Sequence, residues 1–309
     1  MTPYFHIGPK QTSTTLFCCD NLELLRKMPS NCVTLIYCDV LYNSGKSFKD
    51  YKDNLGSPQE AIEWYRPRIE EMRRILKDNG SIYIHCNWRL DAYLRILMDE
   101  IFGMDCFKNQ IHRQHSDKRG FYDNYDSQMD TILYYVKNPN DYIFNMVHGD
   151  RENIVPLFEV GRLDGRDDVR WLGDQIIDLA SMDRHWMVSP TQFEKMVANN
   201  EVRLIDGLPF RYTTIVSIGN LWNEPDMLDP YSRTQDSKAF STPKPKAVLE
   251  RIINISSNPG DLVVDFFLGG GTTAVVAHML GRRFIGCDIN EDACRITADK
   301  IRELNRTNY

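Results

Sequence analysis

A glycine-rich stretch near the end of the chain combines the residue types of a loop that binds a phosphate or a nucleoside. Asp265-Phe266-Phe267-Leu268-Gly269-Gly270-Gly271-Thr272-Thr273-Ala274 joins an apolar segment to a helical pattern. Glycine lets a ligand approach the backbone, and the first turn of the helix offers unpaired N–H groups. Asp288 follows Gly269 by 19 residues, the position of a carboxylate that binds ribose hydroxyls. We therefore expect a nucleoside-containing cofactor here; a tight turn without a ligand is the alternative.

The order of the segments separates two kinds of cofactor. The spacing Gly269-x-Gly271-x-x-Ala274 also satisfies the fingerprint of NAD-binding folds. Such a fold needs several strands after its fingerprint, but only 21 residues follow Asp288, enough for one helix. The missing strands must come from the N-terminal part of the chain. This order predicts a circularly permuted sheet and disfavours NAD.

Apolar runs that alternate with helical patterns must position this loop. They predict strands at 15–19, 33–38, 81–86, 262–267 and 283–289, and helices at 21–28, 88–102, 243–257 and 272–280, with one more helix at the end. A further helix should begin at Pro58, because Ser57 and Glu60 form a capping box, and should end at Asn79-Gly80. Pro67 should kink it. The alternation is typical of an α/β fold with a mostly parallel sheet.

The segment between these two parts has a different texture. Over 111–240 only 131–136 is a clear strand, one helix begins at Ser189-Pro190, and the rest is predicted to be irregular. We therefore divide the chain into an N-terminal part of the sheet domain at 1–110, an insert at 111–240 and a C-terminal part at 241–309.

Composition and charge exclude several classes of protein. The 309 residues are 42% hydrophobic and 26% charged, which is typical of a globular chain with a sizeable core. No apolar run approaches the roughly 18 residues of a membrane-spanning helix, and the first residues lack the pattern of a secretory signal. None of the eight cysteines forms a Cys-x-x-Cys pair, so we expect reduced thiols, no bound metal and a cytoplasmic location. The net charge of −6 argues mildly against a nucleic-acid partner.

The glycine loop, in this chain order, resembles that of the β-class amino-methyltransferases, which use S-adenosylmethionine to methylate exocyclic amines of DNA bases. Their cofactor motif D-P-F-x-G-S-G-T-T is matched by Asp265, Phe267, Gly269, Gly271, Thr272 and Thr273. Their T-Q-K-P element is matched by Thr242-Pro243-Lys244-Pro245, and Asp20 matches the position that contacts the adenine of the cofactor. The resemblance covers about 180 residues in the two sheet parts. It implies a Rossmann-like methyltransferase fold that binds S-adenosylmethionine through these residues and Asp288, with target recognition in the insert.

The catalytic D-P-P-Y of that family is matched in part by Asp39-Val40-Leu41-Tyr42. An exocyclic amine is a poor nucleophile because its lone pair is delocalised into the ring. A carboxylate and a neighbouring backbone carbonyl can accept both N–H hydrogens and favour a tetrahedral nitrogen, while an aromatic ring clamps the base. The resemblance implies that Asp39 and Tyr42 are catalytic and that the base is flipped out of the duplex. Val40 and Leu41 lack the φ restriction of the two prolines, although the carbonyl acceptor is retained.

Double-stranded DNA is the partner that the resemblance implies, and local basic clusters are the candidate contacts. Lys46, Lys49 and Lys52 follow the catalytic residues, and Arg113, Lys118 and Arg119 lie among aromatic residues at the start of the insert. The insert carries 14 Lys and Arg residues against 21 Asp and Glu residues, so it cannot hold DNA through a broad positive face. We expect useful affinity to need a homodimer, a partner subunit or the flipped base itself.

Three hypotheses about function follow. Asp rather than Ser at position 39 is the commoner choice among the family's adenine-N6 enzymes, so sequence-specific DNA adenine-N6 methylation is favoured over cytosine-N4 methylation. A catalytically weak nucleic-acid-binding partner subunit is the second hypothesis, because Val40-Leu41 departs from the family pattern. A glutamine-directed protein methyltransferase is the third, although its similar tetrapeptide normally follows the glycine loop.

Overall fold

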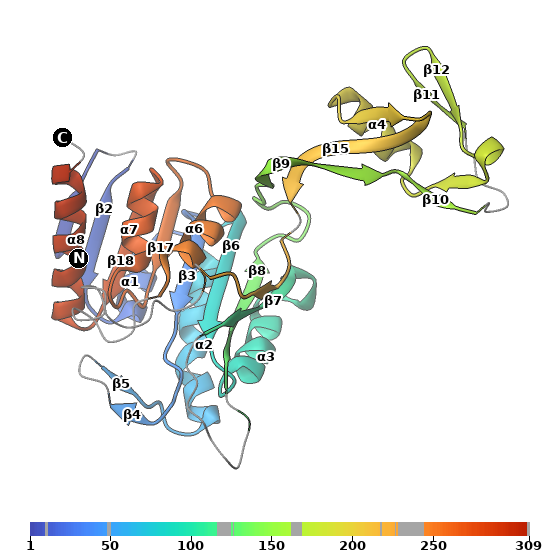
Figure 1. Ribbon diagram of the computed structural model, residues 1–309. Helices are drawn as coiled ribbons and strands as arrows, with labels where there is room; N and C mark the ends of the chain where they lie inside the picture. The colour runs from blue at the N-terminus through green and yellow to red at the C-terminus, as the bar shows by residue number, and fades with distance from the viewer. Residues whose placement is uncertain are drawn as a thin grey trace. The chain divides into compact units, whose positions relative to one another are not determined.

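A nine-stranded sheet carries both sequence motifs (Figure 1). The computed structural model describes residues 1–9, 12–47, 51–115, 125, 127–161, 169–216, 218–225, 227 and 244–307. The sheet has the order β1-β2-β18-β17-β3-β6-β8-β7-β16. β1 and β8 run antiparallel to their neighbours, and the other strands of this sheet are parallel to one another. The mostly parallel α/β fold is therefore confirmed.

The bounds of four of these strands agree with the prediction from the sequence. The strands are β1 Phe5–Ile7, β2 Thr14–Cys18, β3 Val33–Asp39, β6 Leu76–Cys86, β7 Phe107–Gln114, β8 Met129–Val136, β16 Leu221–Trp222, β17 Leu262–Asp265 and β18 Arg283–Asp288. Strands were predicted within two residues of the observed ends of β2, β3, β17 and β18.

Two layers of helices cover the two faces of the sheet (Figure 1). One layer is α1 Asn21–Lys27, α2 Pro58–Ile75 and α3 Asp91–Phe102, and the other is α6 Lys246–Ser256, α7 Thr272–Met279 and α8 Glu291–Thr307. Along β3, Ile36 and Cys38 pack in the core cluster of the first layer, whereas Leu35 and Tyr37 pack in that of the second. This alternation is what a strand buried on both faces requires.

The chain changes direction across the sheet between β17 and β3. From β17 the chain passes through α7 to β18 on one side, and from β3 it passes through α2 to β6 on the other. Ligands of open α/β sheets bind outside the carboxyl ends of the strands at such a switch point. The N-terminal strand β3 pairs directly with the C-terminal strand β17, so the expected circular permutation is confirmed.

The junction of α2 and β6 differs from the prediction. The capping box of Ser57 and Glu60 is present, and Pro67 lies inside the helix. The helix ends at Ile75, however, and β6 begins at Leu76 rather than at 81. The register of β6 against β3 shifts after the pair Val33–Leu76, so residues 77–80 form an irregularity within the strand. Asn79-Gly80 therefore marks this irregularity and not the end of the helix.

The prediction that most of 111–240 is irregular was wrong. β7 and β8 complete the central sheet, and Met146–Ile218 forms a second compact unit, separate from Met1–Asn145 with Gly219–Tyr309. The second unit contains β9 Val147–Pro156, β10 Phe158–Val160, β11 Val169–Leu172, β12 Gln175–Asp178, β13 Arg184–Trp186, α4 Pro190–Ala198, β14 Val202–Ile205 and β15 Leu208–Val216. The capping box of Ser189 and Gln192 begins α4, as expected. Most of these strands are too short to show a clear period in the sequence.

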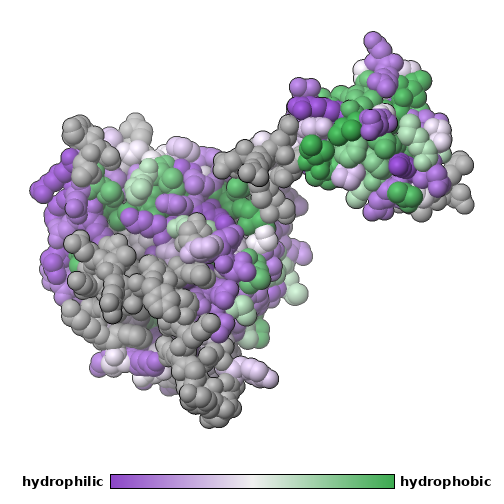
Figure 2. Space-filling model, viewed as in Figure 1, coloured by the Kyte–Doolittle hydropathy of each residue, from purple (hydrophilic) through white to green (hydrophobic). Residues whose placement is uncertain are grey.

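The second unit has a small core of its own, and apolar residues are exposed among polar ones on its surface (Figure 2). Leu157, Ile177, Leu179, Trp186, Phe193 and Val202 form the core. On the β11–β12 hairpin, Trp171 and Ile176 pair across the strands and are 61% and 54% exposed, while Arg170 and Ile177 are buried. Across the described residues, no helix is long and apolar enough to cross a membrane.

Candidate active site

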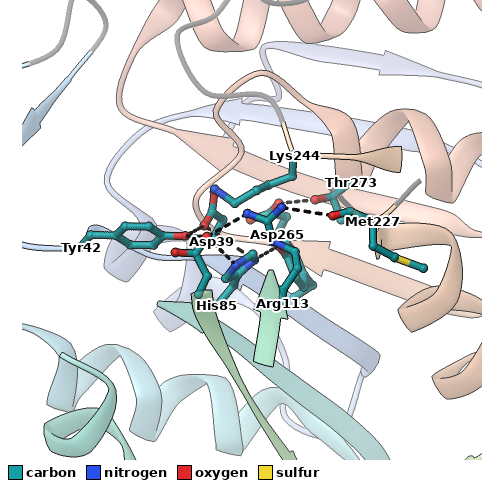
Figure 3. A network of polar contacts seen from close by, with 10 residues as sticks. Asp39, Tyr42, His85, Arg113, Met227, Lys244, Asp265 and Thr273 are labelled. Atoms are coloured by element: carbon teal, nitrogen blue, oxygen red, sulfur yellow. Dashed lines mark hydrogen bonds and ion pairs between the residues drawn. The ribbon is translucent and has the colours of Figure 1, made fainter. Parts of the chain in front are cut away.

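The carboxyl ends of β3 and β17 bring the two motifs together (Figure 3). Asp39 ends β3 and Asp265 ends β17, and the two strands are neighbours in the sheet. Asp39 remains partly exposed, whereas Asp265 is fully buried. The structure therefore places the proposed catalytic residue beside the proposed cofactor loop, as the chain order requires.

The carboxylate of Asp265 accepts hydrogen bonds from both ends of the glycine loop. Its Oδ1 accepts a hydrogen bond of 2.9 Å from the backbone N–H of Phe267, and its Oδ2 accepts one of 2.6 Å from Oγ1 of Thr273. Burial raises the pKa of Asp265 to about 7, against the lowering effect of these two hydrogen bonds. Asp265 and Thr273 thus fix the two ends of the loop, and the structure shows them bonded to each other.

The glycines of the loop have separate tasks. The N–H of Gly269 donates to Oδ2 of Asp288 over 2.9 Å, which fixes the predicted ribose carboxylate against the loop. Gly271 precedes Thr272, the first residue of α7, and has a φ of +77°. A Cβ at Gly271 would overlap the side chain of Thr297 on α8. Gly271 therefore permits close packing of the loop on α8, besides any contact with a ligand.

Two carboxylates and two aromatic rings lie at the carboxyl ends of β2, β18 and β17. Asp288 ends β18, and Asp20 follows the neighbouring strand β2, where it caps α1 through the N–H of Leu22 at 2.8 Å. Oδ2 of Asp20 is 2.9 Å from a guanidinium nitrogen of Arg68. The centroid of the Phe267 ring is 6.2 Å from that of Trp64.

This donor and acceptor set fits a nucleoside cofactor. The carboxylates of Asp20 and Asp288 can accept hydrogen bonds from hydroxyl or amino groups, and the ring of Phe267 offers an apolar surface to a base. Backbone N–H groups of Gly269 and Asn290 hold the Asp288 carboxylate in place, at 2.9 Å each. Burial raises the pKa of Asp288 above its usual value, and these N–H groups oppose the effect.

The Asp39 carboxylate has one partner three residues away and one from a distant part of the chain. Nζ of Lys244 lies 2.8 Å from Oδ2, and the hydroxyl of Tyr42 donates to Oδ1 over 3.1 Å. Burial acts to lower the pKa of Lys244, but the charges of Asp39 and Asp130 outweigh it and raise that pKa. Lys244 was expected at the cofactor; the contact that the structure shows is with Asp39, the predicted catalytic carboxylate.

A second carboxylate, which was not predicted from the sequence, lies near Asp39. Asp130 on β8 is buried and pairs with Arg113 over 2.9 Å, and its Oδ2 is 3.4 Å from Nε2 of His85. Burial raises the pKa of Asp130, but the contact with His85 and the charges of Lys244 and Arg113 hold it well below its usual range. Burial lowers the pKa of His85, although the neighbouring carboxylates of Asp130 and Asp39 act to raise it.

The six predicted DNA contacts differ in their exposure to solvent. Lys46 and Lys52 are exposed on the hairpin of β4 Lys46–Ser47 and β5 Lys52–Asp53. Arg113 is only 1% exposed and donates to Asp130 and to the carbonyl of Met227, so its expected contact with a DNA phosphate does not agree with its position. Lys49, Lys118 and Arg119 lie outside the described residues. Among the residues that the structure describes, no three His, Cys, Asp or Glu side chains could hold a metal ion.

Comparison with known proteins matches the chain to a family of DNA methylases. Residues 33–299 match the profile of the N6/N4 methyltransferases, described as DNA methylase. The chain is 31% identical over 284 residues to the type II methyltransferase M.EcaI of Enterobacter cloacae, covering 82% of this chain and 61% of that protein. It is 29% identical over 282 residues to the DNA adenine methyltransferase YhdJ of Escherichia coli, covering 88% and 77%.

The fold has a solved counterpart. The structure of the cytosine-N4-specific PvuII DNA methyltransferase aligns with a TM-score of 0.59 at 15% sequence identity, covering 93% of this chain and 86% of that chain. At this identity the likeness concerns the fold alone. The Rossmann-like fold that the family resemblance implied is thereby confirmed.

Proposed function

This chain belongs to the DNA methylase family of N6 and N4 methyltransferases, and on that premise we propose that it methylates N6 of adenine in double-stranded DNA. The methyl donor is S-adenosylmethionine, whose sulfonium group supplies an activated methyl when it is bound. The observation that carries the proposal is the position of Asp39, at the end of β3 and beside the loop that Asp265 holds at the end of β17.

The residues of this site can activate an amine without forming a covalent intermediate. The Asp39 carboxylate and the carbonyl of Val40 accept the two N–H hydrogens of the target amine, which frees the nitrogen lone pair for in-line attack on the donor methyl. The C–S bond breaks as the N–C bond forms, and the methylated nitrogen then loses one proton through the Asp39 carboxylate. Each carboxylate oxygen has two lone pairs, so Asp39 can accept the amine while Tyr42 and Lys244 remain bound. The ring of Tyr42 is then available to pack against the flipped base.

The side chain at position 39 supports adenine as the target, because Asp is the commoner choice in the adenine-N6 enzymes that the motif resembles. The relative YhdJ is a DNA adenine methyltransferase by name, while the PvuII enzyme is cytosine-N4-specific. Cytosine N4 is therefore the alternative target. We assign target recognition to 111–240, and within it Met146–Ile218 forms a compact unit of its own.

Product analysis tests this proposal. The purified chain is incubated with double-stranded DNA and S-adenosylmethionine carrying a labelled methyl group, and the digested nucleosides are identified by mass spectrometry. We expect N6-methyladenine from the wild type and no labelled base from Asp39→Ala. Calorimetry should show that Asp39→Ala keeps its affinity for the cofactor, whereas Asp288→Ala loses about tenfold or more. Detection of labelled N4-methylcytosine would show that cytosine, and not adenine, is the target. Full activity of Asp39→Ala would contradict the mechanism.

A further inference from the structure

The loop after Asp39 is held by a set of hydrogen bonds at the positions where the family pattern has two prolines. The backbone N–H of Val40 donates to the carbonyl of His85 over 3.1 Å. This bond extends the pairing of β3 with β6 beyond the last register pair, Asp39–His85. A proline at position 40 has no N–H and could not make this bond. Compared with proline, Val40 therefore lacks a fixed φ but adds a backbone hydrogen bond.

The next residue is held by a side chain from α2. The hydroxyl of Tyr65 donates to the carbonyl of Leu41 over 2.9 Å, and Tyr65 is almost completely buried. The ring of Tyr65 is fixed in turn by Trp64 and Phe267, with centroids 5.0 Å and 6.3 Å away. A rigid donor thus reaches the backbone between Val40, whose carbonyl faces the amine in the proposed mechanism, and Tyr42.

The far end of the loop is clamped by a buried carboxylate. Asp53 is 3% exposed and accepts hydrogen bonds from the N–H groups of Asn43 at 2.8 Å and Ser44 at 3.0 Å. The hydroxyl of Ser44 also donates to Asp53. Asn43 has a φ of +53°, so the chain turns sharply directly after Tyr42. With both ends fixed, the Leu41 carbonyl is the middle anchor of the loop.

We propose that Tyr65 is a positioning residue for methyl transfer, whose hydroxyl holds the Leu41 carbonyl and thereby replaces the backbone restriction that proline supplies in the family pattern. The role rests on the proposed function, because what Tyr65 positions is the Val40 carbonyl and the Tyr42 ring. Tyr65 touches neither substrate nor cofactor in this role and acts only through the loop.

Tyr65→Phe removes the hydroxyl and keeps the ring, and two measurements follow its effect. Hydrogen exchange should become faster in a peptide covering 39–45 and stay unchanged in one covering 33–38. The kcat for methyl transfer should fall about tenfold, the effect of one lost hydrogen bond of ordinary strength, with the KM for S-adenosylmethionine unchanged. Tyr83→Phe is the matched control, because the buried hydroxyl of Tyr83 bonds to Ser256 at 2.8 Å, away from this loop. Tyr83→Phe should alter neither quantity.

A double-mutant comparison separates positioning from simple packing. In a Leu41→Pro background the proline restrains the loop, so Tyr65→Phe should reduce kcat less than twofold there, against tenfold in the wild-type background. A core-packing role for Tyr65 would give the same loss in both. If Leu41→Pro does not fold, the hydrogen exchange and the kcat of Tyr65→Phe in the wild-type background test the proposal. Unchanged exchange at 39–45, or an unchanged kcat, contradicts the positioning role, whereas a wild-type chain without methyl transfer contradicts the proposed function instead.

Discussion

Nζ of Lys244 lies 2.8 Å from Oδ2 of Asp39 and so joins the two halves of the permuted domain at the proposed catalytic carboxylate. Lys244 comes from the segment before α6, and Asp39 ends β3 near the start of the chain. The ammonium group also lies 5.3 Å from the centroid of the Tyr42 ring. One cation therefore contacts both residues that the proposed mechanism places at the target base.

Replacing Lys244 by methionine keeps a long, unbranched side chain and removes its charge. We expect methyl transfer to fall by tenfold or more while the affinity for S-adenosylmethionine changes little, because the contact of Lys244 is with Asp39. The free energy of unfolding should fall by about 1–3 kcal/mol, since Asp39 loses a charged partner. Calorimetry and denaturant titration measure the two effects. If the variant instead loses cofactor affinity and keeps normal turnover, Lys244 contacts the cofactor and not the target base site.

Burial of Asp265 should make the stability of the fold depend on pH. The pKa of Asp265 is raised to about 7 in the folded chain, against an ordinary value of 3.8. Between these values the folded state binds more protons than the unfolded state, so the free energy of unfolding falls as pH rises from about 4 to 7. The maximum slope from this one group is about 1.4 kcal/mol per pH unit.

Asp265→Asn isolates this contribution, because the amide carries no titrating proton. Denaturant unfolding of both proteins between pH 5 and pH 7 should show the wild type losing stability relative to Asp265→Asn as pH rises. Parallel curves for the two proteins would mean that Asp265 is ionised throughout this range.

The role of Gly271 in packing can be separated from its backbone conformation. Gly271 and Gly281 have φ values of +77° and +70°, but only a Cβ at Gly271 would meet another side chain, that of Thr297; nothing described lies within 4 Å of a Cβ at Gly281. Gly281→Ala should therefore cost about 1 kcal/mol for the left-handed backbone. Gly271→Ala should cost roughly 1–3 kcal/mol more because of overpacking. Equal losses of stability would show that the backbone conformation alone requires glycine.

Local signals in the sequence predicted much of this structure. The capping box at Ser57, the glycine loop at 269–271 and the apolar strand before Asp39 each depend on residues close together in the chain, and each was placed correctly. Arg113 and Asp130 were not, because their pairing depends on two strands meeting in the sheet. As isolated sequence positions, Arg113 resembles a surface contact and Asp130 a residue before a strand. Tyr65 likewise lies within a helix whose pattern gives no sign of its bond to Leu41.

Binding to DNA without a target site should be weak and should depend only shallowly on salt. Of the predicted phosphate contacts, Arg113 is buried, and the insert 111–240 is acidic. Lys46 and Lys52 remain as exposed candidates among the described residues. Each neutralised phosphate contributes about −0.9 to the slope of log K against log salt concentration. Exchanging Lys46 and Lys52 together for alanine should therefore reduce the slope by about 2.

Arg26 and Lys27 provide the matched control for this experiment. Both are exposed at the end of α1. This helix begins at the carboxyl end of β2 and leads back to the amino end of the parallel strand β3, away from the site. Exchanging this pair for alanine removes the same charge and should leave the slope unchanged. Fluorescence anisotropy with a duplex lacking the target site measures each slope. A wild-type monomer that binds tightly with a slope near −8, the sign of about nine neutralised phosphates, would show that the main DNA-binding surface lies elsewhere on the chain.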